Sequence, residues 1–415
     1  MVEEKIIKFY REKSGLTQAQ LCEGICSVTH LSKIERGLTE YSKEITGMLA
    51  QRLKINLQAE TNRYHRLSKK LQQWEQAIVM QHGAESKTYR EELEKEPLIK
   101  MPEFQQIYQL LSVRYFLFNQ DLNTANQLIK EIQRQEGILS GYTRNMLKHI
   151  IGIYYFQMGE FRHCIEHLTK IDIEHYNNEE YFYHLALAYH SVHSNITAYY
   201  YGKKALSFFQ RTLNILRIID TELMLIVQLN AKELHHFEET KEKYEQLLKL
   251  CDSVRSPAYK AKVYHNFGFE CYRRKLYSES VGYFNDALAL MDQSSPQYLT
   301  TLYQYINASY RGNLTPVTTL LTLAEKGFKG AKKINSPQWM DFQMVIYEMK
   351  DDNENYYTLI EETILPYYQK IGYFILVEHY ERKLFYYYSE KGDLKKAMKI
   401  AHSYIGSKTS FYDHH

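Results

Sequence analysis

The sequence predicts an all-α protein, with a small helical unit at the front and an array of helical hairpins behind it. Two observations carry this prediction. The 415 residues include only 18 Gly and 7 Pro, too few for an architecture of short strands and turns. Small and large apolar residues also recur along the chain at helical spacing, which indicates an internal repeat. With 44% hydrophobic residues, the chain can bury a sizeable core.

Charge and cysteine content narrow the classes of function. Residues 1–66 hold eleven Lys and Arg against eight Asp and Glu, and residues 67–415 hold 41 of each. The positive excess therefore lies at the front, where a nucleic-acid contact would gain from it. The five cysteines form no CxxC pair, which argues against a disulfide framework or a zinc knuckle. With neither an apolar signal segment nor a long apolar run, we expect a cytoplasmic protein that contacts no membrane.

The internal repeat is clearest in four segments. Two small residues stand twelve positions apart in each of three pairs: Gly152 and Cys164, Ala186 and Ala198, and Gly268 and Ser280. A fourth copy includes Ala397, and weaker copies can be placed around Tyr115, residues 225–250, Tyr310 and Tyr347. Small residues at this spacing allow the two helices of a hairpin to cross closely. We therefore predict a series of helical hairpins.

This pattern resembles tetratricopeptide repeats. The resemblance implies a right-handed superhelix, whose concave inner surface is lined mainly by the first helix of each hairpin and usually binds a ligand. An apolar stripe through Leu67, Leu71, Trp74 and Ile78 predicts a helix before the array. We therefore place a linker helix and the repeat domain, for sensing and oligomerisation, at residues 67–415.

The pattern of capping and apolar residues in positions 1–66 predicts a compact unit of four or five helices. Thr17 can cap a short helix that begins at Gln18, and Ser27 can cap a second one after a tight turn. Leu31 and Ile34 would face inward on the second helix. Apolar residues at helical spacing before and after this pair predict the remaining helices.

The motifs LTQAQL and LSKIERG in this unit resemble the helix-turn-helix domains of the phage-repressor and Xre type, over about the first 60 residues. The resemblance implies that the helix from Val28 enters the major groove of DNA. The candidate DNA contacts are Gln18, Ser27, Thr29, His30 and Lys33, with Gln18 donating to a phosphate. Arg11 and Glu35 match positions that form an internal ion pair in that family, so we assign them to structure. The alternative is an ordinary helical cap on the array.

A repressor-type domain followed by tetratricopeptide-like repeats resembles the RRNPP family of peptide-pheromone-responsive regulators, especially its NprR/PlcR-like branch. The resemblance implies a quorum-sensing transcription regulator that binds double-stranded promoter DNA as a homodimer or tetramer and is switched by a short signalling peptide. One alternative is a Rap-like regulator that binds a phosphorelay response regulator and promotes its dephosphorylation. Another is a scaffold with a relic DNA-binding domain. The intact LTQAQL and LSKIERG motifs favour the transcription regulator.

Asparagine side chains suit an extended peptide, because one amide offers a donor and an acceptor to the peptide backbone. The family uses groove asparagines in this way, and the resemblance carries that role to Asn266, Asn307 and Asn230, most firmly to Asn266. Weaker candidates, for a peptide carboxylate, are Arg114, Arg144 and His149. The alternative for each of these six residues is an ordinary solvated position on a helix.

Other motifs carry no prediction of chemistry. His163 and His167 stand one helical turn apart, but they lack a third ligand and the glutamate of an HExxH motif. We expect a surface pair there, and the same at His235, His236, His414 and His415. The sequence contains no GxGxxG, GxxxxGK[ST] or GxSxG motif. We therefore predict no metal, no cofactor and no enzymatic activity.

Overall fold

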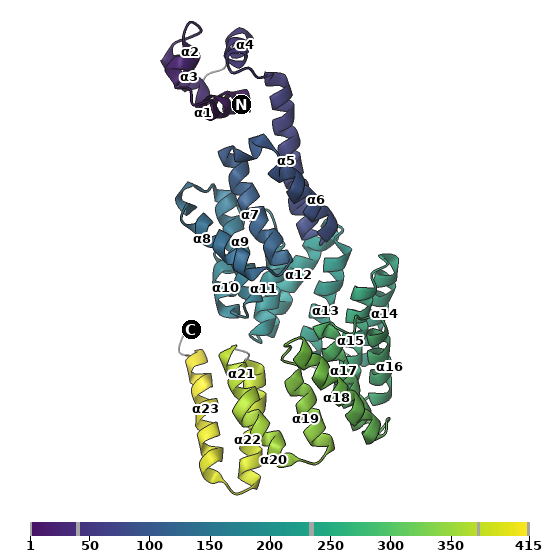
Figure 1. Ribbon diagram of the computed structural model, residues 1–415. Helices are drawn as coiled ribbons and strands as arrows, with labels where there is room; N and C mark the ends of the chain where they lie inside the picture. Colours follow the sequence, from purple (N-terminus) through teal and green to yellow (C-terminus); the bar gives the residue numbers. More distant parts are fainter. Residues whose placement is uncertain (1, 39–41, 232–235, 372–373, 413–415) are drawn as a thin grey trace. The chain divides into compact units, whose positions relative to one another are not determined.

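The computed structural model describes residues 2–38, 42–231, 236–371 and 374–412 (Figure 1). Helices joined by short turns account for this part of the chain, and it contains no strand. The predicted all-α fold is therefore confirmed.

The chain divides into two compact units. The first comprises Met1–Tyr154 with Lys170–Asn177, and the second comprises Tyr155–Thr169 with Asn178–His415. The α-helices of the first unit are α1 (Val2–Lys13), α2 (Gln18–Cys22), α3 (Val28–Glu35), α4 (Lys43–Arg52), α5 (Leu57–Val79), α6 (Gly83–Glu94), α7 (Pro102–Phe118), α8 (Leu122–Gln133) and most of α9 (Gly141–Gln157). Two 3-10 helices, η1 (Pro97–Lys100) and η2 (Glu136–Ile138), separate some of them.

The four N-terminal helices enclose a small core of their own. Ile7 of α1, Leu21 of α2, Leu31 and Ile34 of α3, and Leu49 of α4 are completely buried and pack in one cluster. Full burial of such a side chain contributes roughly 1.5 to 3 kcal/mol, so these few residues supply most of the cohesion of the unit. The inward positions predicted for α2 and α3 are confirmed.

An ion pair between α1 and α3 closes this core on one side. Arg11 Nε donates to Glu35 Oε1 at 2.5 Å and Arg11 Nη2 to Glu35 Oε2 at 2.9 Å, a two-pronged geometry that fits a guanidinium to a carboxylate. Arg11 Nη1 also donates to the carbonyl of Leu16 at 3.0 Å. The side chain of Arg11 is 11% exposed and that of Glu35 only 3%. The hydrogen bond to Glu35 raises the pKa of Arg11, and the predicted structural pair is confirmed.

Helix α5 runs without a break through position 66, where the sequence suggested a domain boundary. Its apolar stripe of Leu67, Leu71, Trp74 and Ile78 is buried as predicted. The indole of Trp74 donates to Ser86 Oγ at 3.1 Å and so ties α5 to α6. A division into residues 1–66 and 67–415 therefore remains a prediction, and it falls inside one continuous helix.

The second unit is built from helices packed pairwise. They are α10 (Phe161–Thr169), α11 (Tyr181–Ser191), α12 (Asn195–Arg211), α13 (Ile215–Ala231), α14 (Phe237–Ser253), α15 (Pro257–Arg273), α16 (Tyr277–Ala289), α17 (Pro296–Arg311), α18 (Val317–Lys333), α19 (Trp339–Met349), α20 (Asn353–Leu359), the π-helix η3 (Ile360–Ile364), α21 (Leu365–Lys370), α22 (Phe374–Glu390) and α23 (Leu394–Tyr412).

The predicted repeats coincide with pairs of neighbouring helices. Neighbouring helices α11 and α12, α15 and α16, and α22 and α23 pack extensively against each other, and α12 packs in turn against α13. The weaker copies also form pairs, namely α7 with α8, α13 with α14, α17 with α18, and α19 with α20. The hairpin prediction is confirmed for these segments.

Small residues stand where helices approach most closely. A Cβ atom on Gly268 of α15 would lie only 2.9 Å from the ring of Phe284 in α16. Opposite it, the buried Ser280 donates its hydroxyl to the carbonyl of Gly268 at 2.7 Å. On Gly327 of α18, a Cβ atom would overlap the buried ring of Phe342 in α19, so a similar contact joins one hairpin to the next. The spacing of the helices thus depends on side chains that are small or absent.

Several turns inside the hairpins use a residue with a positive φ that is not glycine. Gln120, Lys275, Asn313 and Asp351 follow the ends of α7, α15, α17 and α19 with φ values of 61°, 63°, 51° and 54°. This left-handed conformation lets backbone amides satisfy carbonyls at the helix end. In an L residue it costs roughly 1 kcal/mol relative to glycine, which the packing of each hairpin must offset.

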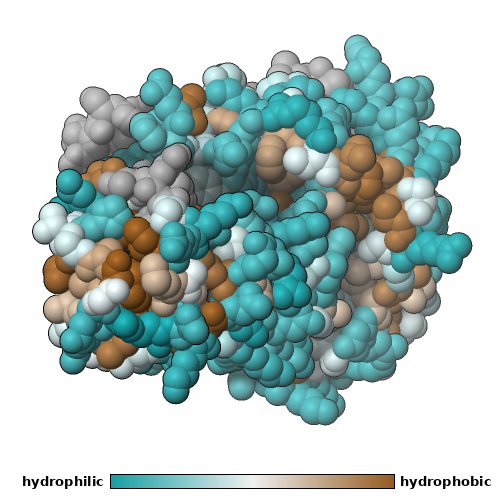
Figure 2. Space-filling model, turned by 90° about the horizontal axis from the view of Figure 1, so that it is seen from above, coloured by the Kyte–Doolittle hydropathy of each residue, from teal (hydrophilic) through white to brown (hydrophobic). Residues whose placement is uncertain are grey.

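Figure 2 shows one face of the molecule, on which hydrophilic side chains predominate and the hydrophobic ones lie in separate groups. Across the residues described above, no helix has both the length and the apolar character needed to cross a membrane.

We expect Gly327→Ala to destabilise the repeat domain by about 1 to 3 kcal/mol, because the added methyl group must displace the buried ring of Phe342. Gly282→Ala is the matched control. Gly282 lies within α16 with nothing within 4 Å of its added Cβ, so alanine should stabilise the helix by up to about 1 kcal/mol. Urea unfolding followed by circular dichroism measures both. Equal effects of the two substitutions would contradict this account of helix spacing.

A second prediction concerns the ion pair under α3. Arg11→Ala leaves the buried carboxylate of Glu35 without its main partner, which should cost about 3 kcal/mol of local stability. Amide hydrogen exchange should then accelerate in α1 to α4. The control is Lys8→Ala, which removes an exposed cation from the same helix and should change stability by less than about 0.5 kcal/mol. If exchange in α3 is the same in both variants, the pair does not hold the helix.

Candidate functional site

Caps and one glycine set the geometry of α2 and α3. Thr17 Oγ1 accepts from the amide of Gln20 at 3.2 Å, and Gln20 Oε1 accepts from the amide of Thr17 at 2.8 Å, which completes a capping box. Ser27 Oγ accepts from the amide of His30 at 3.2 Å and caps α3. Between the helices, Gly24 has a φ of 69°, a conformation that glycine adopts without steric cost.

One face of α3 is anchored and the opposite face is open. Leu31 and Ile34 are completely buried against α1, α2 and α4. Because of this anchorage, Thr29 and Lys33 project into solvent, and 45% of Val28 is exposed. The open face therefore combines a hydroxyl, a cation and an apolar branched side chain. The edges and phosphates of a DNA major groove are recognised by such groups.

The other predicted DNA contacts have additional roles within the domain. Ser27 is exposed, and His30 is half-buried beside it. Gln18 was expected to donate to a phosphate, but its Nε2 donates to Glu35 Oε2 at 2.8 Å. In this structure Gln18 therefore extends the ion pair of Arg11 and Glu35. The sequence motif alone does not distinguish these two roles, because both need an amide at the start of α2.

The sequence did not indicate the roles of two residues in this region, Arg52 and Val28. Arg52 of α4 donates from Nη1 to the carbonyl of Leu21 at 3.0 Å and also to the carbonyl of Glu23. It thus satisfies carbonyls at the end of α2 and fixes α4 to the turn. The sequence predicts Val28 only as the start of a helix. Its exposure makes it available for apolar contact with a thymine methyl group.

In the second unit, two of the predicted asparagines occupy equivalent positions. Asn266 of α15 and Asn307 of α17 each stand two residues before a small buried residue, Gly268 and Ser309 respectively. Asn266 Nδ2 donates to the carbonyl of Lys262 at 2.8 Å, and no described residue uses its Oδ1. Both amides are half-buried, so a ligand could reach them.

Asn230, the third predicted asparagine, belongs to α13, and its side chain lies outside the described residues. The three weaker candidates belong to the first unit. His149 is completely buried and its Nδ1 lies 2.9 Å from the phenol oxygen of Tyr176, which gives the ring a role in the core. Arg114 is also buried, at 8% exposure. Arg144 is exposed, and its Nη2 donates to the carbonyl of Leu139 at 3.1 Å.

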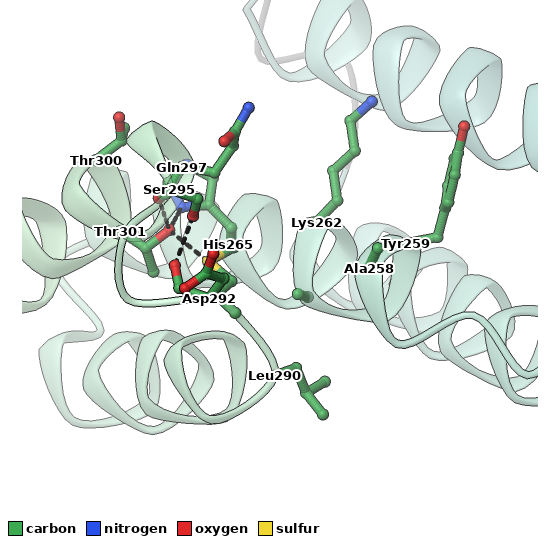
Figure 3. A pocket seen from close by; sticks show the side chains of 12 residues that line it. Ala258, Tyr259, Lys262, His265, Leu290, Asp292, Ser295, Gln297, Thr300 and Thr301 are labelled. Carbon is green, nitrogen blue, oxygen red and sulfur yellow. Dashed lines mark hydrogen bonds between the residues drawn. The ribbon is translucent and has the colours of Figure 1, made fainter. Parts of the chain in front are cut away.

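A pocket of about 550 Å³ lies between α15, the end of α16 and the start of α17, and His265 is among the residues that line it (Figure 3). His265 Nδ1 lies 2.9 Å from Thr301 Oγ1, whose own hydroxyl donates to the carbonyl of Gln297 at 2.9 Å. Burial lowers the pKa of His265 to about 4, so the ring is neutral near pH 7.

Lys262 and Tyr259 extend in the same direction from α15 at the mouth of this pocket (Figure 3). Both reach Asp220 of α13, a carboxylate with only 5% of its side chain exposed. Lys262 forms an ion pair with it, Tyr259 OH donates to it at 3.1 Å, and Arg217 Nη1 lies 3.5 Å away. This buried acid is therefore fully partnered and ties α13 to α15.

Asp341 of α19 has a different environment, since it is partly exposed and forms no hydrogen bond or ion pair with any other described residue. Its partial burial raises the pKa of Asp341 to about 7. Burial, followed by the charge of Asp341, also raises the pKa of Tyr303 in α17 and of Tyr380 in α22.

His163 and His167, the pair for which the sequence predicts no metal site, lie where α10 meets α9. The rings of His163 and His167 flank Tyr155, at 5.2 Å and 5.4 Å between centroids. The described part of the chain contains no group of three or more potential ligands that could hold a metal ion. His235, His414 and His415 lie outside the described residues.

Comparison with known proteins covers both parts of the chain. A helix-turn-helix family model matches residues 7–59. The transcriptional activator NprA of Geobacillus stearothermophilus is 22% identical over 396 residues, which cover 92% of this chain and 97% of NprA. The similarity thus extends well beyond the N-terminal domain.

Solved structures share the helical fold. NprR in complex with its cognate peptide NprX is 22% identical and superposes with a TM-score of 0.62, over 80% of this chain and 99% of that one. A Rap protein complexed with competence and sporulation factor is 15% identical with a TM-score of 0.70, over 84% of this chain and 99% of that one. The helix-turn-helix match, the full-length similarity to NprA and this shared fold make the chain similar to RRNPP-family regulators, which combine an N-terminal helix-turn-helix domain with a repeat domain.

Proposed function

We propose that this protein is a transcription regulator that binds promoter DNA through α3 and is switched by a short signalling peptide bound to its repeat domain. The observation that carries the proposal is the open face of α3, where Thr29 and Lys33 project from a helix whose other face is anchored in the core. The similarity to NprA, an activator, supports it. The proposal assigns a binding role to the chain and no catalysis.

The DNA-binding part of the proposal places α3 in the major groove. Lys33 then contacts a phosphate or a guanine edge, and Thr29 and Ser27 contact phosphates or bases. His30 lies at the edge of this DNA-contacting surface. Gln18 can assist with the second hydrogen of its amide, because only one is used by Glu35. Two copies of the chain would present two such helices about one DNA turn apart, so we propose a dimer or a tetramer.

The peptide-sensing part of the proposal rests on Asn266 and Asn307. Their equivalent positions on α15 and α17 would let two amides pair with an extended backbone, and Asn230 of α13 would continue the series. The pocket lined by His265, the residue before Asn266, offers space for a peptide side chain. The peptide complexes of NprR and of a Rap protein, which share this fold, support the assignment. A regulator that meets both DNA and an imported peptide would act in the cytoplasm.

The likeness to a Rap protein and to response regulator aspartate phosphatase I of Bacillus subtilis favours a second candidate function for the repeat domain, the binding of a response regulator. That function would need no DNA-binding surface. The open face of α3 and the caps that position it are then unexplained, and we therefore prefer the transcription regulator.

DNA binding can be tested with duplexes that the protein itself selects. Those that the wild-type protein retains from a random pool provide the probe. Lys33→Ala should weaken their binding and reduce the slope of log K against log salt concentration by about 0.9, the value for one lost phosphate contact. Lys69→Ala, which removes an exposed cation from α5, should leave the slope unchanged. A slope unaffected by Lys33→Ala would remove this residue from the DNA surface.

Substitution of Asn266 and Asn307 tests the peptide-binding part of the proposal. A random heptapeptide library passed over the wild-type protein yields ligands that mass spectrometry can identify. For these peptides, Asn266→Ala and Asn307→Ala should each lower the affinity measured by calorimetry by roughly 5- to 100-fold, because a backbone group loses its hydrogen bonds. Asn285→Ala, an exposed position on α16, is the control and should bind as the wild type does. If all three variants bind equally, the two amides are not in the site.

A further inference from the structure

The pocket between α15, the end of α16 and the start of α17 owes its space to small side chains (Figure 3). Ala258 and Ala261 stand about one turn apart on α15, where larger side chains would occupy part of the volume of about 550 Å³. Leu290 and Met291, directly after α16, add further apolar surface. A volume of this size and apolar walls are typical of ligand sites in proteins.

The ionisable side chains of the lining are engaged by neighbours. Lys262 pairs with Asp220, and the phenol of Tyr259 donates to the same carboxylate at 3.1 Å. Asp292 accepts from the amide and from the hydroxyl of Ser294, at 3.0 Å and 2.7 Å. The charges at this pocket are therefore neutralised or hydrogen-bonded within the protein itself.

His265 lines the pocket from α15 and brings no charge to it. Its Nδ1 lies 2.9 Å from Oγ1 of Thr301, a buried residue of α17. Burial lowers the pKa of His265 to about 4, so the ring is uncharged near pH 7. The burial that disfavours a charge on this ring also disfavours a charged ligand group beside it. The pocket is therefore suited to an uncharged group.

The pocket adjoins the asparagine that is proposed to hold a peptide backbone. Asn266 stands one helical turn after Lys262, and its Nδ2 donates to the carbonyl of Lys262 at 2.8 Å. One turn of helix rises about 5.4 Å, and side chains on the same side of an extended chain are roughly 7 Å apart. A peptide whose backbone pairs with Asn266 therefore carries a side chain within reach of the pocket.

We propose that this pocket binds one uncharged, apolar side chain of the signalling peptide, while Asn266 holds the peptide backbone beside it. The inference rests on the proposed function, since it names the kind of peptide residue that the repeat domain selects. Leucine, isoleucine, methionine and phenylalanine have side chains of this kind. Met291 is unbranched and adaptable, so the wall of the pocket adjusts to the shape of the side chain it receives.

The first step of the test defines the side chain in the peptide. Heptapeptides recovered from a random library on the full-length wild-type protein are resynthesised with alanine at each position in turn. Calorimetry should find one apolar position where alanine lowers the affinity by roughly 10- to 100-fold, the effect of burying one large side chain. Aspartate or lysine at that position should lower it at least as much, because the pocket offers no partner for the charge. Aspartate or lysine peptides that bind as tightly as the parent would overturn the proposal.

A variant that fills the pocket then locates this side chain in the protein. Ala258→Trp places an indole in the pocket from an exposed position of α15, which the fold should tolerate. It should weaken the parent peptide by roughly 10- to 100-fold, yet change the affinity of the alanine peptide by no more than about twofold. Ser278→Trp, at an exposed position near the start of α16, is the matched control and should weaken neither peptide.

A second filling variant approaches the pocket from another helix. Gln297→Trp lies at an exposed position of α17 and should reproduce the result of Ala258→Trp. Circular dichroism melting of both variants reports whether the repeat domain is intact. If the two variants weaken the parent and the alanine peptide by the same factor, or weaken neither peptide, the side chain binds elsewhere and the inference is wrong.

The asparagine variant separates this inference from the function on which it rests. Should Asn266→Ala weaken the recovered peptides while the two pocket-filling variants do not, peptide sensing stands and the pocket assignment fails. If no member of the library binds the wild-type protein, the proposed peptide sensing fails and the inference fails with it.

Discussion

Close approach between helices is the constraint on which the repeat domain depends. Gly268 admits the ring of Phe284, and Gly327 admits that of Phe342, at distances that a methyl group would already obstruct. These contacts fix how far apart consecutive helices lie. The spacing in turn decides which side chains of α15, α17 and α19 come together. Asn266, two residues from one such crossing, is thus positioned by the absence of a side chain nearby.

Buried charge serves two purposes in this molecule. Arg11 and Glu35 form a complete pair, and Gln18 occupies part of the remaining hydrogen-bonding capacity of the carboxylate, so the charge orients α3 without leaving an unpaired group. Asp220 is satisfied in the same way. These carboxylates show that the fold neutralises a charge that faces inward when the charge also joins two helices.

Local signals explain how much of the structure could be predicted from the sequence. The caps at Thr17 and Ser27 and the small residues at twelve-residue spacing act within a few helical turns, and the elements they predict are present. The rest depends on tertiary contacts. Nothing near Arg52 in sequence reveals that it closes α2, and Lys275 does not look like a turn residue.

Helix α5 joins the N-terminal four-helix core to α6 in one continuous element. Its 23 residues span about 34 Å. Near its start, Glu60 accepts from Tyr10 of α1 at 2.7 Å, and near its end Trp74 is locked to α6. Because no break interrupts this helix, α6 and α1 are connected through hydrogen-bonded helix and not through a loop.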